Sequence, residues 1–460
     1  MIIDFGSNAA NCHVLFDVNG NYGILNNEIT VNGSNWNGMV SYPNGMKKIS
    51  SKRSTVLNKR IQIPNSVVNM ADAFSSCYRL NQNIQIPNNV TSMYGTFFSC
   101  YNLNQNIQIP NSVTNMEDTF SYCYKLNQNI KIPDNITNMY DTFFSCYNLN
   151  QNIKIPNNVT NMYSTFFGCG NLNQNIQIPD NVTDMANTFN GCRNLNQNIK
   201  IPDGVTDINS LFAICRSLNY NIQIPNSVTQ MVNTFYGCDN LNQNIKIPDN
   251  VVDLSGAFSS CDNLNYNIQI PNGVESVTYM FRHCLCLNQN IRIPDGIKYL
   301  GGMFNGCRNL NQNIRIPDGV TDLSNTFNLC NNLNYNIQIP NSVTRMISTF
   351  YGCDNLNQNI FIPSTVKIAE GAFANCNLIS DISIGDDSDV RCNGAFSPNN
   401  THSRNIWTGA RTAVNLINVN LIRPLNGNTM TGAQIRPTWT EITNGYYNSY
   451  YNIYIYTNAF

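Results

Sequence analysis

The residues with the most chemical potential in this chain are its 17 cysteines. That number is enough for a disulfide framework, a zinc site or a reactive thiol, and spacing decides among these chemistries. Fourteen of them recur at one position every 23 residues. They are Cys77, Cys100, Cys123, Cys146, Cys169, Cys192, Cys215, Cys238, Cys261, Cys284, Cys307, Cys330, Cys353 and Cys376. Zinc sites use close pairs such as Cys-x-x-Cys, so this spacing favours buried thiols that pack as small hydrophobic side chains.

Other residues of catalytic type are few. The three histidines, His13, His283 and His402, lie in no recognisable nucleophile or metal motif. The densest group, His283-Cys284-Leu285-Cys286, is interpreted as one repeat cysteine beside two chance substitutions. No glycine-rich phosphate loop occurs, and the acidic residues are scattered singly. We therefore expect no catalytic, cofactor-binding or metal site; the alternative is an enzyme within residues 397–460.

Composition excludes further classes. Of 460 residues, 42% are hydrophobic and 12% charged, and 26 Lys+Arg nearly balance 27 Asp+Glu to give a net charge of -1. A partner bound through its phosphates needs a basic excess, so we expect no nucleic acid partner. No apolar run reaches the roughly 18 residues that span a bilayer. The first residues also lack a basic segment followed by an apolar one, so we expect neither a signal peptide nor membrane insertion.

The elements that position the cysteines come from an internal repeat. The dipeptide Ile-Pro recurs every 23 residues, with prolines from Pro64 to Pro363 in fourteen copies without insertion. A unit this short cannot be a separate domain, so each copy is one coil of a solenoid.

One coil, Leu103–Tyr124, shows the expected local structure. Ile107 and Ile109 alternate with polar residues as in a short strand that Pro110 ends. The next apolar residues are spaced 3, 4 and 3 apart, which predicts one face of a short helix or 3₁₀ segment. They are Val113, Met116, Phe120 and Cys123. We expect an α/β solenoid with a parallel sheet on one face and strands about 4.8 Å apart. Disulfides between coils fit poorly, because parallel Cβ vectors do not suit their geometry.

This pattern of Leu, Ile-x-Ile-Pro-x-x-Val, Met and Phe-x-x-Cys resembles the BspA-like leucine-rich repeats of bacterial and protist surface proteins. The resemblance covers roughly residues 57–396. It departs from the family pattern in having three residues between the leucine and the first isoleucine, where the pattern has two. The resemblance implies a right-handed leucine-rich-repeat coil array and a role in surface attachment or adhesion, without enzymatic activity.

The flanks of the repeat differ from it. Turn clusters such as Val18-Asn19-Gly20 predict a β-rich N-terminal cap or attachment module over residues 1–56. The solenoid then covers 57–396, with fourteen copies and a degenerate last one. Alternation at Ile453-Tyr454-Ile455-Tyr456 predicts a β-rich C-terminal module over 397–460. Both modules are expected to cap the terminal apolar layers.

Specificity is expected where the copies differ. A tyrosine follows the repeat cysteine in four successive coils: Tyr78, Tyr101, Tyr124 and Tyr147. This column could contact a sugar or protein partner, or form a ladder that only stabilises itself. The middle residue of Ile-x-Ile is basic in six copies: Lys131, Lys154, Lys200, Lys246, Arg292 and Arg315. All but Lys154 precede an aspartate by three residues, so the column indicates charge balance within one turn or a stripe that binds anions. The recurrent asparagines are expected to bond through their amides to neighbouring coils.

We therefore expect a non-enzymatic repeat protein that presents an extended surface to a protein or glycan on a cell surface. The alternative is a fibre, tail-associated or receptor-binding component of a virus or phage particle. Homo-oligomer formation or virion assembly through the flanking modules is a further expectation. The expected location is extracellular, at the cell surface or in a virion.

Overall fold

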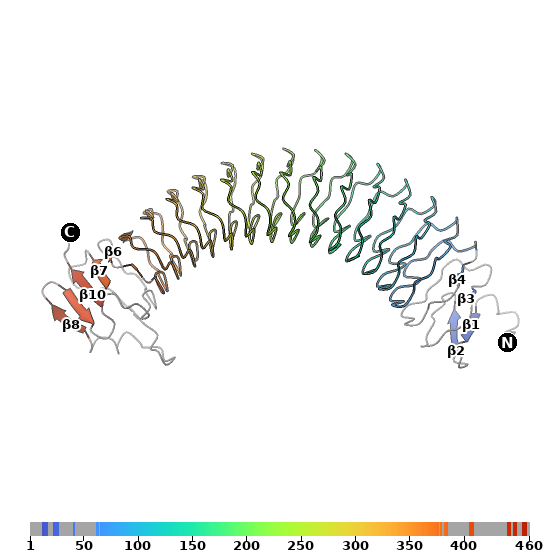
Figure 1. The fold of residues 1–460 in the computed structure, drawn as a ribbon, viewed down its shortest axis with the longest axis horizontal. Helices are drawn as coiled ribbons and strands as arrows, with labels where there is room; N and C mark the ends of the chain where they lie inside the picture. Colours follow the sequence, from blue (N-terminus) through green and yellow to red (C-terminus); the bar gives the residue numbers. More distant parts are fainter. Residues whose placement is uncertain are drawn as a thin grey trace. The chain divides into compact units, whose positions relative to one another are not determined.

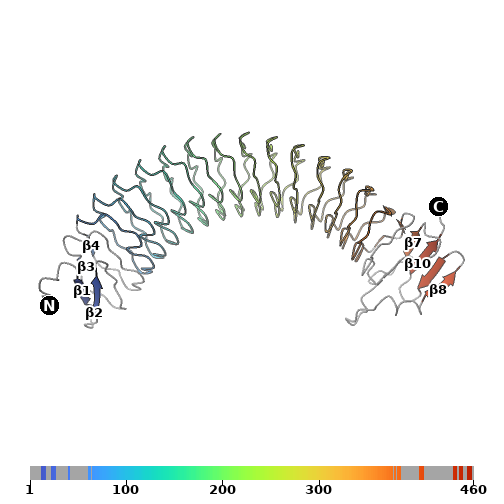
Figure 2. The same ribbon diagram turned by 180° about the vertical axis from the view of Figure 1, so that it is seen from behind.

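The computed structural model describes residues 63, 65–376 and 378–379 in full, and elsewhere the backbone of nine strands. The chain forms two compact units, Met1–Val228 and Thr229–Phe460. Within each unit, the repeat folds into coils that stack one on the next (Figures 1 and 2). No membrane-crossing helix occurs in the part of the chain that the structure describes.

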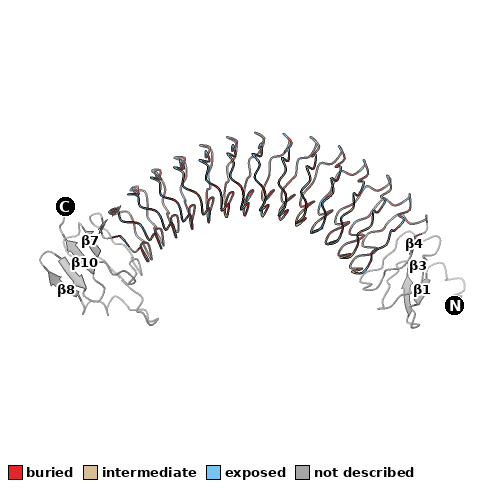
Figure 3. Cartoon of the chain, in the orientation of Figure 1, coloured by how far each residue is buried: buried red, intermediate tan, exposed pale blue. Residues whose placement is uncertain are grey.

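The predicted apolar positions form the core of each unit. In the coil Leu103–Tyr124, the side chains of Ile107, Val113, Met116, Phe120 and Cys123 are fully buried, whereas Ile109 is partly exposed. Phenylalanines of successive coils stack, as do Phe97 and Phe120 with ring centroids 5.6 Å apart. Burial alternates along every coil (Figure 3). The inward side of the repeat is therefore as the sequence predicts.

The predicted helix is wrong. No helix occurs among the described residues, and Met116–Cys123 makes two successive tight turns. The Thr119 N–H donates to Met116 O at 3.1 Å, and the Cys123 N–H donates to Phe120 O at 3.0 Å. In all fourteen coils the residues five before and one before the repeat cysteine have left-handed backbone, with φ between 50° and 77°. Left-handed residues interrupt a right-handed helix, so the spacing of 3, 4 and 3 comes from turns.

The predicted strand at Ile-x-Ile is also wrong for most coils. Only Ile61–Gln62 (β4) and Ile360–Ile362 (β5) are strands at this position. In the reference coil, the Ile107 N–H bonds locally to Gln105 O at 3.0 Å, so it does not donate to a neighbouring coil. Parallel pairing occurs instead just before the methionine position, as in the bridge from Ser92 to Asn115. A continuous parallel sheet on one face is therefore absent from the described coils.

The N-terminal flank contributes two small sheets. Strand β1 (Cys12–Phe16) pairs antiparallel with β2 (Tyr22–Asn26), and β3 (Val40–Ser41) pairs parallel with β4. The turn cluster at residues 18–20 lies outside the described residues, as does most of 1–56. The capping role of this flank stays a prediction.

A six-stranded sheet in the order β5-β6-β7-β10-β9-β8 continues from the last coil. Its further strands are β6 (Asp381–Ile384), β7 (Arg404–Thr408), β8 (Trp439–Ile442), β9 (Gly445–Asn448) and β10 (Ile453–Thr457). The strand predicted at residues 453–456 is confirmed by β10. Most other residues of 397–460 lie outside the described part, so the boundary and role of this module stay predictions.

Candidate interaction surface

The cysteine ladder is structural. All fourteen repeat cysteines are buried thiols, which confirms the predicted packing role. From Cys100 on, these thiols typically donate to the phenylalanine carbonyl one coil earlier, as Cys123 Sγ does to Phe97 O at 3.2 Å. Burial raises the pKa of the Cys123 thiol far above its ordinary value. Because the thiolate is the reactive and metal-binding form, these side chains are chemically quiet.

The group around His283 is interpreted in the same way, as structural. Cys284 is a buried member of the ladder, and Cys286 is partly exposed. His283 has a left-handed backbone, with φ of 58°, and burial lowers the pKa of its imidazole. Among the described residues, no cluster of three or more His, Cys, Asp or Glu side chains is arranged to hold a metal ion.

Asparagines form the predicted amide ladder along the coils. Asn104 Oδ1 accepts the Asn127 N–H at 2.9 Å and the Gln128 side-chain amide at 3.1 Å, both from the next coil. The same arrangement recurs in the C-terminal unit, where Asn334 Oδ1 accepts the Asn357 N–H at 3.0 Å. These side chains link neighbouring coils by hydrogen bonds where the expected sheet is missing. The prediction that the asparagine amides bond to neighbouring coils is therefore confirmed.

The basic column is exposed, but its charge partners differ from those predicted. Lys200 Nζ lies 2.9 Å from Asp180, and an Arg315 guanidinium nitrogen lies 2.9 Å from Asp295. Each aspartate belongs to the preceding coil, so the prediction of pairing with the aspartate three residues later is wrong for these two. Stacking brings the side chain 20 residues earlier to within hydrogen-bond distance. Exposed pairs of this kind contribute about 0.2–1 kcal/mol.

The other members of the basic column are exposed as well: Lys131, Lys154, Lys246 and Arg292. Arg292 donates to Asn272 Oδ1 at 3.2 Å, so an amide takes the place of a carboxylate there.

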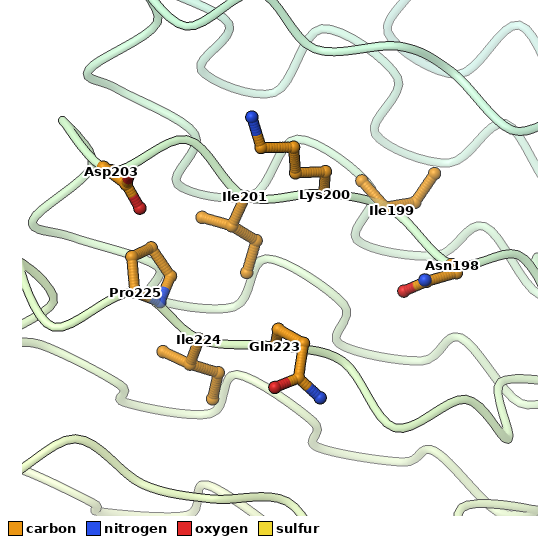
Figure 4. A pocket seen from close by; sticks show the side chains of 8 residues that line it. All are labelled: Asn198, Ile199, Lys200, Ile201, Asp203, Gln223, Ile224 and Pro225. Atoms are coloured by element: carbon orange, nitrogen blue, oxygen red, sulfur yellow. The ribbon is translucent and has the colours of Figure 1, made fainter.

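A surface hollow of about 220 Å³ lies between Asn198–Asp203 and Gln223–Pro225 in the N-terminal unit (Figure 4). The ammonium group of Lys200 points away from Gln223 and Ile224 and pairs with Asp180. Asp203 is the other charged residue of the lining. The hollow therefore lacks a set of converging polar groups that could orient a small ligand.

The four tyrosines of the predicted column lie along one side of the N-terminal unit. Tyr78 stacks on Tyr101 at 4.7 Å between ring centroids, and Tyr101 stacks on Tyr124 at 4.8 Å. Tyr124 is 41% exposed and Tyr147 is 46% exposed. The Tyr147 ring lies against Gly170, where any side chain would collide with it. The column is therefore both a ladder and an accessible surface.

Sequence reasoning missed the aromatic residues beside this column. Tyr122 contacts three rings edge-on or tilted: Phe98 at 5.4 Å, Phe144 at 5.2 Å and Tyr124 at 6.1 Å. Phe144 stacks on Phe167 at 4.5 Å. We call the connected set the aromatic face: Tyr78, Phe98, Tyr101, Tyr122, Tyr124, Phe144 and Phe167. The available signal was aromatic enrichment one and two residues before the cysteine in successive coils.

Carboxylates lie next to this face. Asp118 and Asp141 occupy left-handed positions in successive coils, with φ of 54° and 50°. The Ser121 hydroxyl, adjacent to Tyr122 in sequence, donates to Asp118 Oδ1 at 2.9 Å. Burial and the nearby Asp118 raise the pKa of Asp141 to about 6, and burial also raises the pKa of Asp118. Together with Glu117 they form what we call the acidic strip.

The stack of short coils with a shared apolar interior defines a solenoid repeat protein. Residues 39–150, 71–196, 185–310 and 278–403 each match the family described as BspA type leucine rich repeat region, six copies. The chain belongs to this family, as the sequence pattern predicted.

The chain is similar to two solved structures. A leucine-rich repeat protein from Bacteroides ovatus is 22% identical, with a TM-score of 0.55 over 88% of this chain and 94% of that one. A leucine rich cell surface protein from Faecalibacterium prausnitzii is 24% identical, with a TM-score of 0.46 over 84% and 94%. No protein with a curated description matches the chain. The first likeness supports the repeat fold.

Proposed function

We propose that this chain is a non-enzymatic repeat protein that presents an extended surface to a protein partner at a cell surface. The observation that carries the proposal is the exposed tyrosine column, where Tyr124 and Tyr147 leave over two fifths of their surface to solvent. Tyrosine offers a large contact area at low entropic cost, which makes it a frequent anchor in interfaces.

The contrast between constant buried positions and variable surface positions within each coil supports this proposal. The buried positions are almost invariant along the chain because stacking dictates them. The residue after the cysteine varies instead, from tyrosine through the buried Gly170 to the exposed Arg193 and Arg216. Repeat scaffolds place recognition on such variable exposed columns. The virion alternative has no support in the family match.

A cell-binding experiment tests the proposal. Labelled full-length protein is applied to a panel of intact cells, before and after the cells are treated with protease or with glycosidases. We expect binding that protease abolishes and that Tyr101→Ala/Tyr124→Ala weakens about tenfold, as for loss of an interface anchor. The matched control is Tyr220→Ala/Tyr335→Ala, which removes two exposed tyrosines from a different column.

Thermal unfolding of each variant confirms that it is folded. Binding that survives the Tyr101/Tyr124 change, with the variant folded, would remove the column from the proposal. Binding lost only after glycosidase treatment would make a glycan the partner, and no binding to any cell would refute the proposed function.

A further inference from the structure

Tyr122 is the residue that turns separate aromatic columns into one surface. Its ring contacts Phe98, Tyr124 and Phe144, so rings from three successive coils are connected through it. The coils involved all belong to the N-terminal unit. The aromatic face is therefore continuous across coils.

The backbone of Tyr122 is unfavourable for its side chain. Its φ is 60°, a conformation that glycine adopts freely and that is strained for a bulky residue. Gly168, Gly191 and Gly237 occupy the same position in other coils. Ile214 and Leu329 share this backbone in other coils, so what distinguishes Tyr122 is the set of ring contacts that it makes.

Carboxylates lie on the Tyr122 side of this surface, whereas the exposed Arg79 and Lys125 follow Tyr78 and Tyr124 in the chain. The acidic strip of Glu117, Asp118 and Asp141 borders the face, and no ion pair to any of the three occurs among the described residues. One oxygen of Asp141, Oδ1, is buried without a hydrogen-bond partner in the described part of the chain. These carboxylates are therefore not neutralised by the protein itself.

Tyrosines also line the strip. Tyr140 stacks on Tyr163 with centroids 5.2 Å apart, and Tyr140 is 37% exposed. The negative charges of Asp141, Asp118 and Glu117 contribute to raising the pKa of the Tyr140 phenol, so these groups lie close to its ring. Ring faces and carboxylates are thus interleaved on one side of the unit.

We infer that the aromatic face and the acidic strip together bind a positively charged protein segment rich in arginine and lysine. Guanidinium groups stack on tyrosine rings and pair with carboxylates in the same contact, so this surface offers both of their preferred partners. An anionic polymer would be repelled by the strip. The inference deepens the proposed function, on which it rests, by naming the chemistry of the partner.

An oligoarginine peptide is the probe that tests this inference with the full-length protein. Binding is measured by calorimetry at low and at physiological salt, beside a Gly-Ser peptide of equal length and a neutral oligosaccharide. We expect the oligoarginine to bind, salt to weaken it, and the two neutral probes not to bind.

Matched variants locate the site. Asp118→Asn/Asp141→Asn should weaken oligoarginine binding about tenfold, by loss of two charge contacts. Asparagine fits these backbone positions, since Asn187 and Asn233 occupy them in other coils. The control Asp134→Asn/Asp203→Asn removes the same amount of charge beside the basic column, and this variant should bind as the wild type does.

A second pair of variants tests the rings. Tyr122→Gly should weaken binding about fivefold, the size of one cation–π contact, and glycine suits the backbone there. The control is Ile214→Gly, which changes the same position of another coil, where φ is 59°.

Equal weakening by both charge variants would overturn the inference, because it would show attraction to net charge alone. Binding of the oligosaccharide and not of oligoarginine would also overturn it. In either case, cell binding that still depends on Tyr101 and Tyr124 would leave the proposed function standing, so the two failures are distinguishable.

Discussion

In the left-handed turns, replacing a residue with glycine should have the opposite effect on stability from the one it has in a helix. Ser76 and Ser145 lie one residue before the repeat cysteine, with φ of 60° and 56°. We consider Ser76→Gly/Ser145→Gly against Ser76→Ala/Ser145→Ala, because alanine keeps the side-chain strain and glycine removes it. In a helix, glycine would instead be the less stable choice by about 1 kcal/mol per site.

The magnitude follows from the backbone. A left-handed residue with a Cβ costs about 1–2 kcal/mol, and the extra freedom of glycine in the unfolded chain offsets about 0.5–1 kcal/mol of that gain. The net gain is about 0.5–1 kcal/mol per site. The two sites lie in coils far apart, so their effects add to about 1–2 kcal/mol.

Urea unfolding of the three proteins measures this difference. We expect the glycine variant to unfold at higher urea than the alanine variant, and the alanine variant to stay near the wild type. A control, Ala213→Gly, places glycine where φ is not positive and should destabilise by about 0.5–1 kcal/mol. A glycine variant less stable than the alanine variant would refute the turn assignment.

Three further results are expected. Because the folded-state pKa of Asp141 is raised to about 6, its protonated form stabilises the fold at acid pH, and that stability is lost as the pH rises through 6. The thermal midpoint of Asp141→Asn relative to that of the wild type should therefore increase from pH 4 to pH 7. A difference in midpoint that does not depend on pH would contradict this. In the native protein, a thiol reagent followed by peptide mapping should modify Cys286 before any ladder cysteine, and early ladder labelling would argue against their burial. A double-mutant cycle between Lys200 and Asp180 should give a coupling of about 0.2–1 kcal/mol that salt weakens, and zero coupling at low salt would show that the contact between coils is not populated.

The interior of the repeat was predictable because stacking imposes it. Every coil must present the same apolar side chains to its neighbours, so comparison of copies within one chain reveals Val113, Phe120 and Cys123 as core positions. The amide ladder was predictable for the same reason, since Asn104 recurs at a fixed place in each coil.

The path of the backbone was not predictable from apolar spacing alone. Intervals of 3 and 4 residues arise from helices and also from consecutive tight turns. The distinguishing signal lies in polar positions: residues such as Asp118, Asn187 and Gly256, which tolerate left-handed backbone, recur five residues before the cysteine. The ion pair of Lys200 with Asp180 was missed because it depends on the offset between stacked coils.

The candidate surface was half predictable. The tyrosine column follows from one repeated position, whereas the role of Tyr122 depends on contacts among positions that repeat irregularly. Comparison of the copies shows which residue recurs at one position of the repeat. It does not show which side chains of neighbouring positions contact one another.

Hydrogen exchange with and without oligoarginine tests the central claim, that recognition lies on the aromatic face, most directly. We expect slower exchange in peptides covering residues 94–147 of the full-length protein, with the Asp118→Asn/Asp141→Asn protein losing that protection. Protection confined to the basic column, or unchanged in that variant, would contradict the account.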